Sequence, residues 1–438
     1  MRNCWNEKFE AMPFRELQSF QIHHLKKTVG RVYERIPFYR NKFDAIGFKP
    51  KDLKKLNDLA ELPFTIKTDL RDQYPSGFLA VPMNRVSKIH ASSGTTGKPV
   101  VNFYTTNDID QWAECVARKM VGAGIGPNDI FQIAYGMGLF TGGLGYYHGC
   151  LKLGTMIIPA SSGQTERQIM LMKDFHTTAI GSTPSYALTI VEKAQEMDID
   201  LTKLPLRVGI MGAEPWSDEM REEIELKMGI KAMDTYGLTE LCGPGVAFEC
   251  QAQDGMHINE DHFIAEIIDP LTTEVLPVAA VGELVLTSIQ REAMPLIRYR
   301  TRDITSLRRE KCSCGRTFTK MERVQGRSDD MLIISGVNIF PSQIENLLLD
   351  FKEIEPQYTI FVRKKRYLDA LHVEVEANPE VYKSGAQAIT ELESRISNHL
   401  REMIGIGISI KVVSPKSIIR SEGKAKRVID ERGKQNFA

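Results

Sequence analysis

From residue 86 onward the chain alternates short apolar runs with amphipathic stretches, and this alternation constrains the fold more than any other feature. Runs such as IFQIAY, TMIIPA and LRVGIMG have the length and composition of buried strands. Residues 107–122, 164–175 and 184–196 have a helical pattern instead. Strands that alternate with helices indicate an α/β fold in which helices cover the sheets.

The length of 438 residues exceeds what one ordinary core supports, so we expect at least two domains. Residues 1–60 have a helical pattern, and residues 262–305 are strand-rich. The stretch GRSDDMLIISG combines glycine, serine and charged residues ahead of a new unit of strands and helices. We therefore predict a large N-terminal domain, residues 1–328, that includes a strand-rich subdomain, and a small C-terminal α+β domain, residues 329–438.

The composition excludes several classes of protein. Lysine plus arginine and aspartate plus glutamate both number 56, so the net charge gives no reason to expect nucleic acid or an anionic membrane as a partner. Seven cysteines, an odd number in a long chain, are not typical of a disulfide framework. The first ten residues, MRNCWNEKFE, contain no apolar leader, and no run of 18 apolar residues occurs. We expect a cytoplasmic protein that acts on small molecules.

The segment HASSGTTGKPV, residues 90–100, is the first candidate for a binding site. Glycines allow tight turns that bring backbone N–H groups to an anion, while Ser and Thr hydroxyls and Lys98 add donors. The spacing excludes a Walker A loop, because Gly94 and Gly97 lie three apart and Pro99 follows the lysine. Taken alone, such a run is more often a polar surface turn.

Five further motifs accompany this loop: GAEPW at 212–216, YGLTE at 236–240, YRTRD at 299–303, GRSDD at 326–330 and Gly-Lys at 423–424. Their order and spacing resemble the adenylate-forming superfamily of acyl-CoA synthetases over nearly the whole chain. Longer stretches, such as AYGMGLFTGGLGYYHG and DGMHINEDHFIAEIIDP, resemble the phenylacetate–CoA ligase family within it. The resemblance implies a large adenylate-forming domain that holds the nucleotide and the acid, and a small mobile C-terminal domain.

The resemblance also implies two half-reactions. A carboxylate attacks the α-phosphate of ATP, which gives an acyl-adenylate and pyrophosphate, and the thiol of coenzyme A then displaces AMP. The expected substrate is an aryl acid, and phenylacetate is the leading candidate. Two alternatives stay open: an adenylating enzyme for another aryl acid or for a carrier-protein thiol, and a non-catalytic nucleotide-binding sensor. Relatives are often dimers, which makes a homodimer an expectation for this chain.

Matched to the family's motifs, the resemblance assigns the nucleotide to particular positions. The loop would hold the β- and γ-phosphates through Ser93, Thr95, Thr96 and Lys98. Thr239 would contact the α-phosphate, and Glu240 would bind Mg²⁺, a hard cation that prefers carboxylate oxygen. The adenine would be framed by Gly212, Ala213, Glu214, Pro215, Asp234, Tyr236 and Gly237.

Asp303 would accept hydrogen bonds from both ribose hydroxyls, a role suited to an ionised carboxylate. Arg327 would contact the ribose or a phosphate. Without the resemblance, Asp303 could instead form a surface ion pair with Arg300 or Arg302, and Tyr236 could be a core aromatic whose hydroxyl is satisfied.

Lys424 is the expected catalytic cation, because a flexible point charge can bridge the carboxylate and the α-phosphate as they approach. Its neighbours Lys426 and Arg427 leave open that it is a solvated lysine of the tail. Since Lys424 belongs to the small domain, the resemblance implies rotation of that domain about a hinge at Asp329, with Asp330 as the alternative.

The stretch AYGMGLFTGGLG, residues 134–145, is the candidate acid pocket. Tyr135 and Phe140 would provide an apolar wall for a flat ring, and Gly142 and Gly143 would leave space beside it. These glycines could instead allow close packing between a helix and a strand.

A structural zinc site is predicted from Cys250, His257, Cys312 and Cys314, because thiolate and imidazole suit tetrahedral Zn²⁺. The Cys-x-Cys spacing is tighter than usual, but a glycine follows Cys314 as in metal knuckles. Cys242 and His262 are reserve ligands, and free buried cysteines are the alternative.

Overall fold

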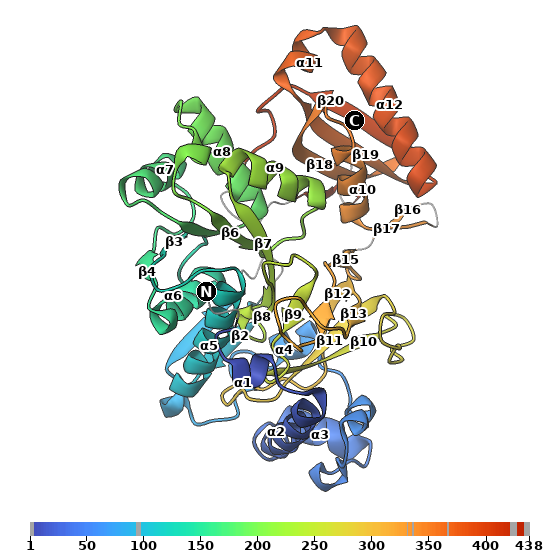
Figure 1. Cartoon of the computed structure of the whole chain (residues 1–438). Coiled ribbons are helices and arrows are strands. Elements are labelled where there is room, and N and C mark those ends of the chain that lie inside the picture. The colour runs from blue at the N-terminus through green and yellow to red at the C-terminus, as the bar shows by residue number, and fades with distance from the viewer. Residues whose placement is uncertain are drawn as a thin grey trace.

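The computed structural model describes residues 4–92, 98–330, 332–334, 337–365, 368–420 and 427–432. A nine-stranded sheet lies at its centre (Figure 1). Its order is β13 (Leu307–Arg308), β14 (Lys320–Met321), β9 (Met256–Ile258), β8 (Gly243–Glu249), β7 (Lys231–Leu238), β6 (Val208–Gly212), β5 (Ala179–Ser182), β3 (Ile130–Ile133) and β4 (Met156–Ile158). Strands β4, β3, β5, β6 and β7 are parallel, and β7 pairs with β8 in the antiparallel sense.

The parallel part explains the short apolar runs of the sequence. All residues of β5 and β6 are buried, as expected where helices cover both faces of a parallel sheet. The helices of this region are α5 (Thr106–Gly122), α6 (Thr141–Leu153), α7 (Thr165–Asp174), α8 (Pro184–Glu196) and α9 (Asp218–Met228). Helix α5 begins in a capping box between Thr105 and Asp108, and α6 ends at Gly154 in the left-handed conformation. The predicted α/β class is confirmed.

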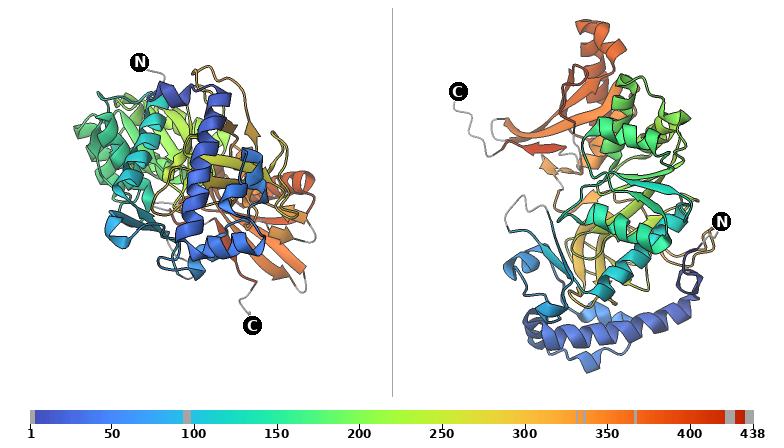
Figure 2. Two further views of the ribbon diagram at one scale, coloured as in Figure 1. Left: turned by 90° about the horizontal axis from the view of Figure 1, so that it is seen from below. Right: turned by 90° about the vertical axis from the view of Figure 1, so that its left-hand side faces the viewer.

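A four-stranded antiparallel sheet forms the strand-rich part that the sequence predicted. Its order is β10 (Phe263–Ile268), β11 (Gly282–Ser288), β12 (Tyr299–Thr305) and β15 (Gly326–Arg327). A separate hairpin, β1 (Lys88–Ala91) and β2 (Val101–Tyr104), flanks the Ser/Thr/Gly loop. The helices at the N-terminal end are α1 (Glu7–Glu10), α2 (Phe14–Arg35), α3 (Pro37–Ala45) and α4 (Lys67–Asp72), and α2 runs along one edge of the molecule (Figure 2). Short 3₁₀ turns span Pro50–Asp52, Leu56–Glu61, Met83–Arg85 and Leu201–Lys203.

The C-terminal part has its own sheet and its own core. Strands β20 (Ile408–Val413), β19 (Leu368–Ala377), β18 (Ile354–Lys365) and β21 (Val428–Asp430) form the sheet. Beside it lie the hairpin β16 (Leu332–Ile334) and β17 (Val337–Ile339), and helices α10 (Pro341–Leu349), α11 (Pro379–Lys383) and α12 (Ala386–Ile404). Its buried apolar residues form a cluster separate from the clusters of the N-terminal part. The boundary predicted between residues 328 and 329 falls between β15 and β16 and stays a prediction.

None of the helices in the described ranges is long and apolar enough to span a membrane.

Candidate active site

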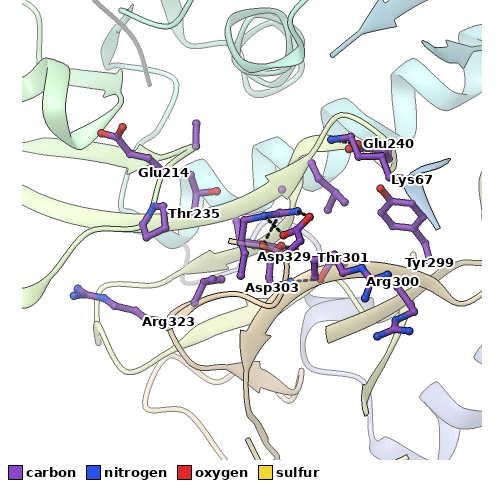
Figure 3. Close-up of a pocket in the computed structure, with 18 of the residues that line it drawn as sticks. Lys67, Glu214, Thr235, Glu240, Tyr299, Arg300, Thr301, Asp303, Arg323 and Asp329 are labelled. Carbon is purple, nitrogen blue, oxygen red and sulfur yellow. Dashed lines mark hydrogen bonds and ion pairs between the residues drawn. The ribbon is translucent and has the colours of Figure 1, made fainter. Parts of the chain in front are cut away.

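A pocket of about 510 Å³ opens beside β7, β12 and α4 (Figure 3). Ten of the residues singled out in the sequence line it: Ala213, Glu214, Pro215, Asp234, Tyr236, Gly237, Glu240, Asp303, Arg327 and Asp329. They lie on β7, β12 and β15 or in the segments that follow β6, β7 and β15, which are far apart in sequence. A volume of this size falls in the range of small-molecule and cofactor pockets.

Asp303 lines this pocket and is held there by two donors, one charged and one polar. Strand pairing sets Asp303 opposite Arg327, whose Nη1 donates to Oδ1 at 3.0 Å. The Tyr236 hydroxyl donates to Oδ2 at 2.5 Å. Burial and the charge of Asp303 raise the pKa of Tyr236, so its hydroxyl remains a proton donor at neutral pH.

The alternative partners of Asp303 are engaged elsewhere. Arg300 forms a bidentate pair with the buried carboxylate of Glu283, with distances of 2.9 and 2.8 Å, and Arg302 reaches the same carboxylate at 3.5 Å. Arg327 also donates to Asp329, at 2.9 and 3.0 Å. Asp303, Arg327 and the expected hinge residue Asp329 therefore form one charged chain along the edge of the pocket.

Glu240 lies at the other side of the pocket, beside Lys67 and Tyr299 (Figure 3). The Lys67 Nζ lies 3.1 Å from Glu240 Oε1, and the Glu240 side chain is 6% exposed. Burial, then the charge of Glu240, raises the pKa of Tyr299. Lys67 is a site residue that the sequence analysis missed, because nothing in FTIKTDL indicates that the first residue of α4 reaches a motif more than 170 positions away.

Asp234 lies in the middle of β7 and lines the pocket. Burial, then the charge of Glu249, raises its pKa to about 6. Its backbone N–H donates to Glu249 at 2.8 Å, and Arg323 lies 3.7 Å from its carboxylate. A half-neutralised acid at this position can both donate and accept hydrogen bonds near pH 6.

A second cavity, of about 120 Å³, adjoins the pocket. Its wall includes the predicted Tyr135, Phe140 and Gly142, and also Tyr146, whose ring stacks on Tyr135 at 5.3 Å between centroids. Ala213, Thr235, Gly237 and Leu238 line both cavities. Thr239 lines the smaller one.

Gly143 is not among the residues that line the smaller cavity. A Cβ at Gly143 would lie 2.8 Å from Met137 Cγ and 2.9 Å from the carbonyl oxygen of Gly136. Close packing against residues 135–137, which lie between β3 and α6, explains this glycine. Gly142 differs, because the atom nearest to its added Cβ belongs to the Phe140 ring of the cavity wall, at 2.6 Å.

The four predicted zinc ligands lie together at the edge of the sheet. Their ligand atoms are all within 4.8 Å of one another. The Cys250 and Cys312 sulfurs are 3.6 Å apart, and Cys314 Sγ lies 3.4 Å from His257 Nε2. A disulfide requires about 2.05 Å between sulfurs, so these cysteines are free, and thiolates about 2.3 Å from a tetrahedral ion would be separated by a distance similar to that observed. The residues fit a zinc ion. The reserve ligand His262 lies elsewhere, beside Asp261 at 3.5 Å.

Some predicted residues are not placed by this structure. Ser93, Thr95, Thr96 and Lys424 lie outside the described residues. Lys98 is described, and its Nζ lies 5.6 Å from the centroid of the Tyr74 ring; it is not among the residues that line the pocket. Gly212 is likewise not part of the lining, but it directly precedes four residues that are, Ala213 to Trp216.

Comparison with known proteins identifies the family. Residues 54–291 match the model of the AMP-binding enzyme family, and residues 336–432 match that of the AMP-binding enzyme C-terminal domain. The chain is 49% identical to the phenylacetate-coenzyme A ligase of Aromatoleum evansii, over 98% of each chain. It is 47% identical to the enzyme of the same name from Escherichia coli (strain K12), over 97% of each chain. The chain belongs to the phenylacetate–CoA ligase family of adenylate-forming enzymes.

Membership confirms several expectations from the sequence. The protein is an AMP-forming acid–CoA ligase, and the adenylate-forming family uses ATP and coenzyme A with small-molecule substrates.

Solved structures of one relative, 2-hydroxyisobutyryl-CoA ligase, match to different extents. The structure described as the postadenylation state with 2-HIB-AMP has a TM-score of 0.93 at 29% identity, over 98% of this chain and 93% of that one. The structure described as the thioesterification state has a TM-score of 0.73 at 30% identity, with the same coverage. Both structures are of the same enzyme and match this chain with nearly the same identity and the same coverage. The difference in TM-score therefore reflects a different arrangement of the chain in the two structures.

Proposed function

We propose that this protein joins phenylacetate to coenzyme A through a phenylacetyl-adenylate, releasing pyrophosphate and then AMP. The observation that carries the proposal is the pair of adjoining cavities, about 510 and about 120 Å³, with four lining residues in common. The larger has the volume of a cofactor pocket. The smaller is close to the roughly 150 Å³ of a cavity known to accommodate benzene. We assign the phenyl ring to this smaller cavity and the nucleotide to the larger one.

In the adenylation step the ribose would lie against Asp303, whose carboxylate is oriented by hydrogen bonds from Arg327 and Tyr236. The adenine would lie near Glu214 and Asp234, at the end of the pocket that faces the C-terminal part. The carboxylate would approach the α-phosphate where the two cavities meet, between Gly237 and Thr239.

Two anions meet in this step, so positive charge must be supplied around the phosphorus. We assign this role to Lys424 and to the phosphate loop with Ser93, Thr95, Thr96 and Lys98. Glu240, buried and facing the pocket, would hold Mg²⁺, which would neutralise phosphate charge when bound. Asp329, at the end of the charged chain from Asp303, would be the hinge for the second half-reaction.

The zinc ion would be structural, because all four positions of a tetrahedral site are filled by Cys250, His257, Cys312 and Cys314. Metal analysis of protein purified without chelator should give about one zinc per chain. Less than about half an equivalent would refute this assignment. A homodimer and a cytoplasmic location also stay predictions, and the mass of the particle in solution measures the first.

Two experiments test the function. The first measures AMP release with a panel of aryl and fatty acids, with and without coenzyme A. We expect release to depend on coenzyme A and to be fastest with phenylacetate. Activity on fatty acids alone would contradict the substrate, and transfer to a carrier-protein thiol in place of coenzyme A would support the alternative.

The second experiment replaces Lys424 by alanine. Adenylation should fall by about 100-fold or more, because charge stabilisation of this kind typically contributes that much. Thioester formation from supplied phenylacetyl-adenylate should continue. Undiminished adenylation by Lys424→Ala would refute the role of the lysine.

A further inference from the structure

Arg420 joins the two parts of the chain through two carboxylates. Its Nε and Nη2 donate to Glu192 Oε2 and Oε1, at 2.9 and 3.0 Å. Its Nη1 and Nη2 donate to Glu376 Oε1 and Oε2, at 2.7 and 2.9 Å. Glu192 belongs to α8 of the N-terminal part, and Glu376 belongs to β19 of the C-terminal sheet. Both pairs are bidentate, the geometry in which a guanidinium binds carboxylates with the best defined orientation.

The Glu376 side of this triad belongs to the C-terminal part alone. The Glu376 side chain is fully buried, and it also accepts hydrogen bonds from the backbone N–H groups of Lys416 and Ile418, at 3.0 and 2.6 Å. These contacts fix the turn that precedes Arg420. The Arg420–Glu192 pair differs, because it links the C-terminal part to α8, which packs into a separate hydrophobic core of the N-terminal part.

Two further contacts lie on the same face of α8. Lys416 pairs with Glu196, and Arg427 Nη2 lies 3.5 Å from Ser185 Oγ. Positions 185, 192 and 196 are separated by seven and four residues, a spacing that puts them on one side of a helix. Arg420 and Arg427 are the described residues on either side of segment 421–426, which contains Lys424. The chain therefore enters and leaves that segment against one face of α8.

We propose that Arg420 is a positioning residue for adenylation, which acts through Glu192 to hold the chain at residue 420, four positions before Lys424, against α8. This inference rests on the proposed function. A contact between parts with separate cores forms only when those parts are suitably arranged. The arrangement here matches the postadenylation structure of the relative far better than its thioesterification structure. The Arg420–Glu192 pair thus stabilises the arrangement for the first half-reaction and contributes nothing to the second.

The test is Glu192→Gln, which keeps the size of the side chain and removes its charge. The matched control is Glu166→Gln, because Glu166 pairs with Lys193 at 2.8 Å within the N-terminal part. Adenylation is measured as phenylacetate-dependent exchange between ATP and pyrophosphate. Thioester formation is measured as consumption of coenzyme A with supplied phenylacetyl-adenylate.

We expect Glu192→Gln to slow the exchange by about 5-fold, the upper range for a partly exposed ion pair. The loss should appear in kcat and not in the KM for ATP, while thioester formation keeps its rate or gains. Glu166→Gln should match the wild-type protein in both assays. In an Arg420→Gln background, Glu192→Gln should cause no further loss, because the two substitutions remove one interaction.

An exchange rate equal to that of Glu166→Gln, or an equal loss in both half-reactions, would overturn the proposal. Additive losses in the double variant would do the same. These results are distinct from failure of the proposed function, in which the wild-type protein itself does not exchange with phenylacetate. If another acid supports exchange, the same comparison is made with that acid.

Discussion

Phe140→Ala tests whether the small cavity holds the ring of the acid. Phe140 precedes α6 and lines the cavity, yet 42% of the residue is exposed. Its removal should therefore leave the fold nearly intact, since the large losses of stability come from fully buried aromatics. The neighbouring Leu139→Ala is the control, because Leu139 is 64% exposed and is not part of the cavity lining.

The expected effect on binding follows from two contributions. An aromatic pair is worth about 1 kcal/mol beyond the area it buries. Uncovering about 40 Å² of the bound ring costs about another 1 kcal/mol, at roughly 25 cal/mol per Å². The sum of about 2 kcal/mol corresponds to a roughly 30-fold higher KM for phenylacetate. The change in kcat should be smaller, because the lost contact is present in both the ground state and the transition state.

The assay is steady-state AMP release in the presence of coenzyme A, with phenylacetate and with 2-naphthylacetate. Phe140→Ala should also improve the bicyclic acid relative to phenylacetate, because the cavity of about 120 Å³ is enlarged. A KM for phenylacetate no different from that of Leu139→Ala would refute the placement of the ring in this cavity.

Three further predictions concern packing, pH and metal. Gly237→Ala should abolish adenylation and lower the free energy of unfolding by about 3 kcal/mol or more, since its Cβ would lie 1.6 Å from the carbonyl oxygen of Gly243. Gly30→Ala is the control, because its Cβ would meet open space, and it should change neither adenylation nor stability. Urea unfolding of the two variants compares their stabilities. Burial raises the pKa of Glu345 from 4.5 to about 7, so wild-type stability falls as pH rises through this range. Glu345→Gln should therefore raise the free energy of unfolding by up to about 3 kcal/mol at pH 8 and leave it unchanged at pH 4. A melting temperature at pH 8 below that of the wild-type protein would contradict this. Removing zinc with a chelator should lower the melting temperature, and added zinc should restore it; an unchanged temperature would mean that the cluster does not hold a structural ion.

The sequence motifs contribute residues that the structure brings together in one pocket. Tyr236 and Asp303 stand in two motifs 67 positions apart, and the structure joins them by a hydrogen bond. Helix periodicity could also have found Tyr146, which lies four residues after Gly142 and thus on the same side of α6.

Other parts of the site had no signal in the sequence. Lys67 reaches Glu240 because α4 is held next to β12, the strand of the YRTRD motif. A β-bridge between Thr65 and Tyr299 makes this connection. The partner of Asp303 was also missed, since the choice of Arg327 over Arg300 or Arg302 depends on strand register. Such long-range pairings are determined by the tertiary fold and not by local pattern.

The four residues shared by the two cavities have a consequence for engineering. A larger side chain at Gly237 or Ala213 would narrow the larger cavity, which we propose for the nucleotide, as well as the smaller one, which we propose for the acid. Selection for a new acid at these positions would therefore also weaken ATP binding. Phe140 and Tyr146 line the smaller cavity only. A library aimed at new acids should therefore vary the α6 side of the cavity and leave the shared wall unchanged.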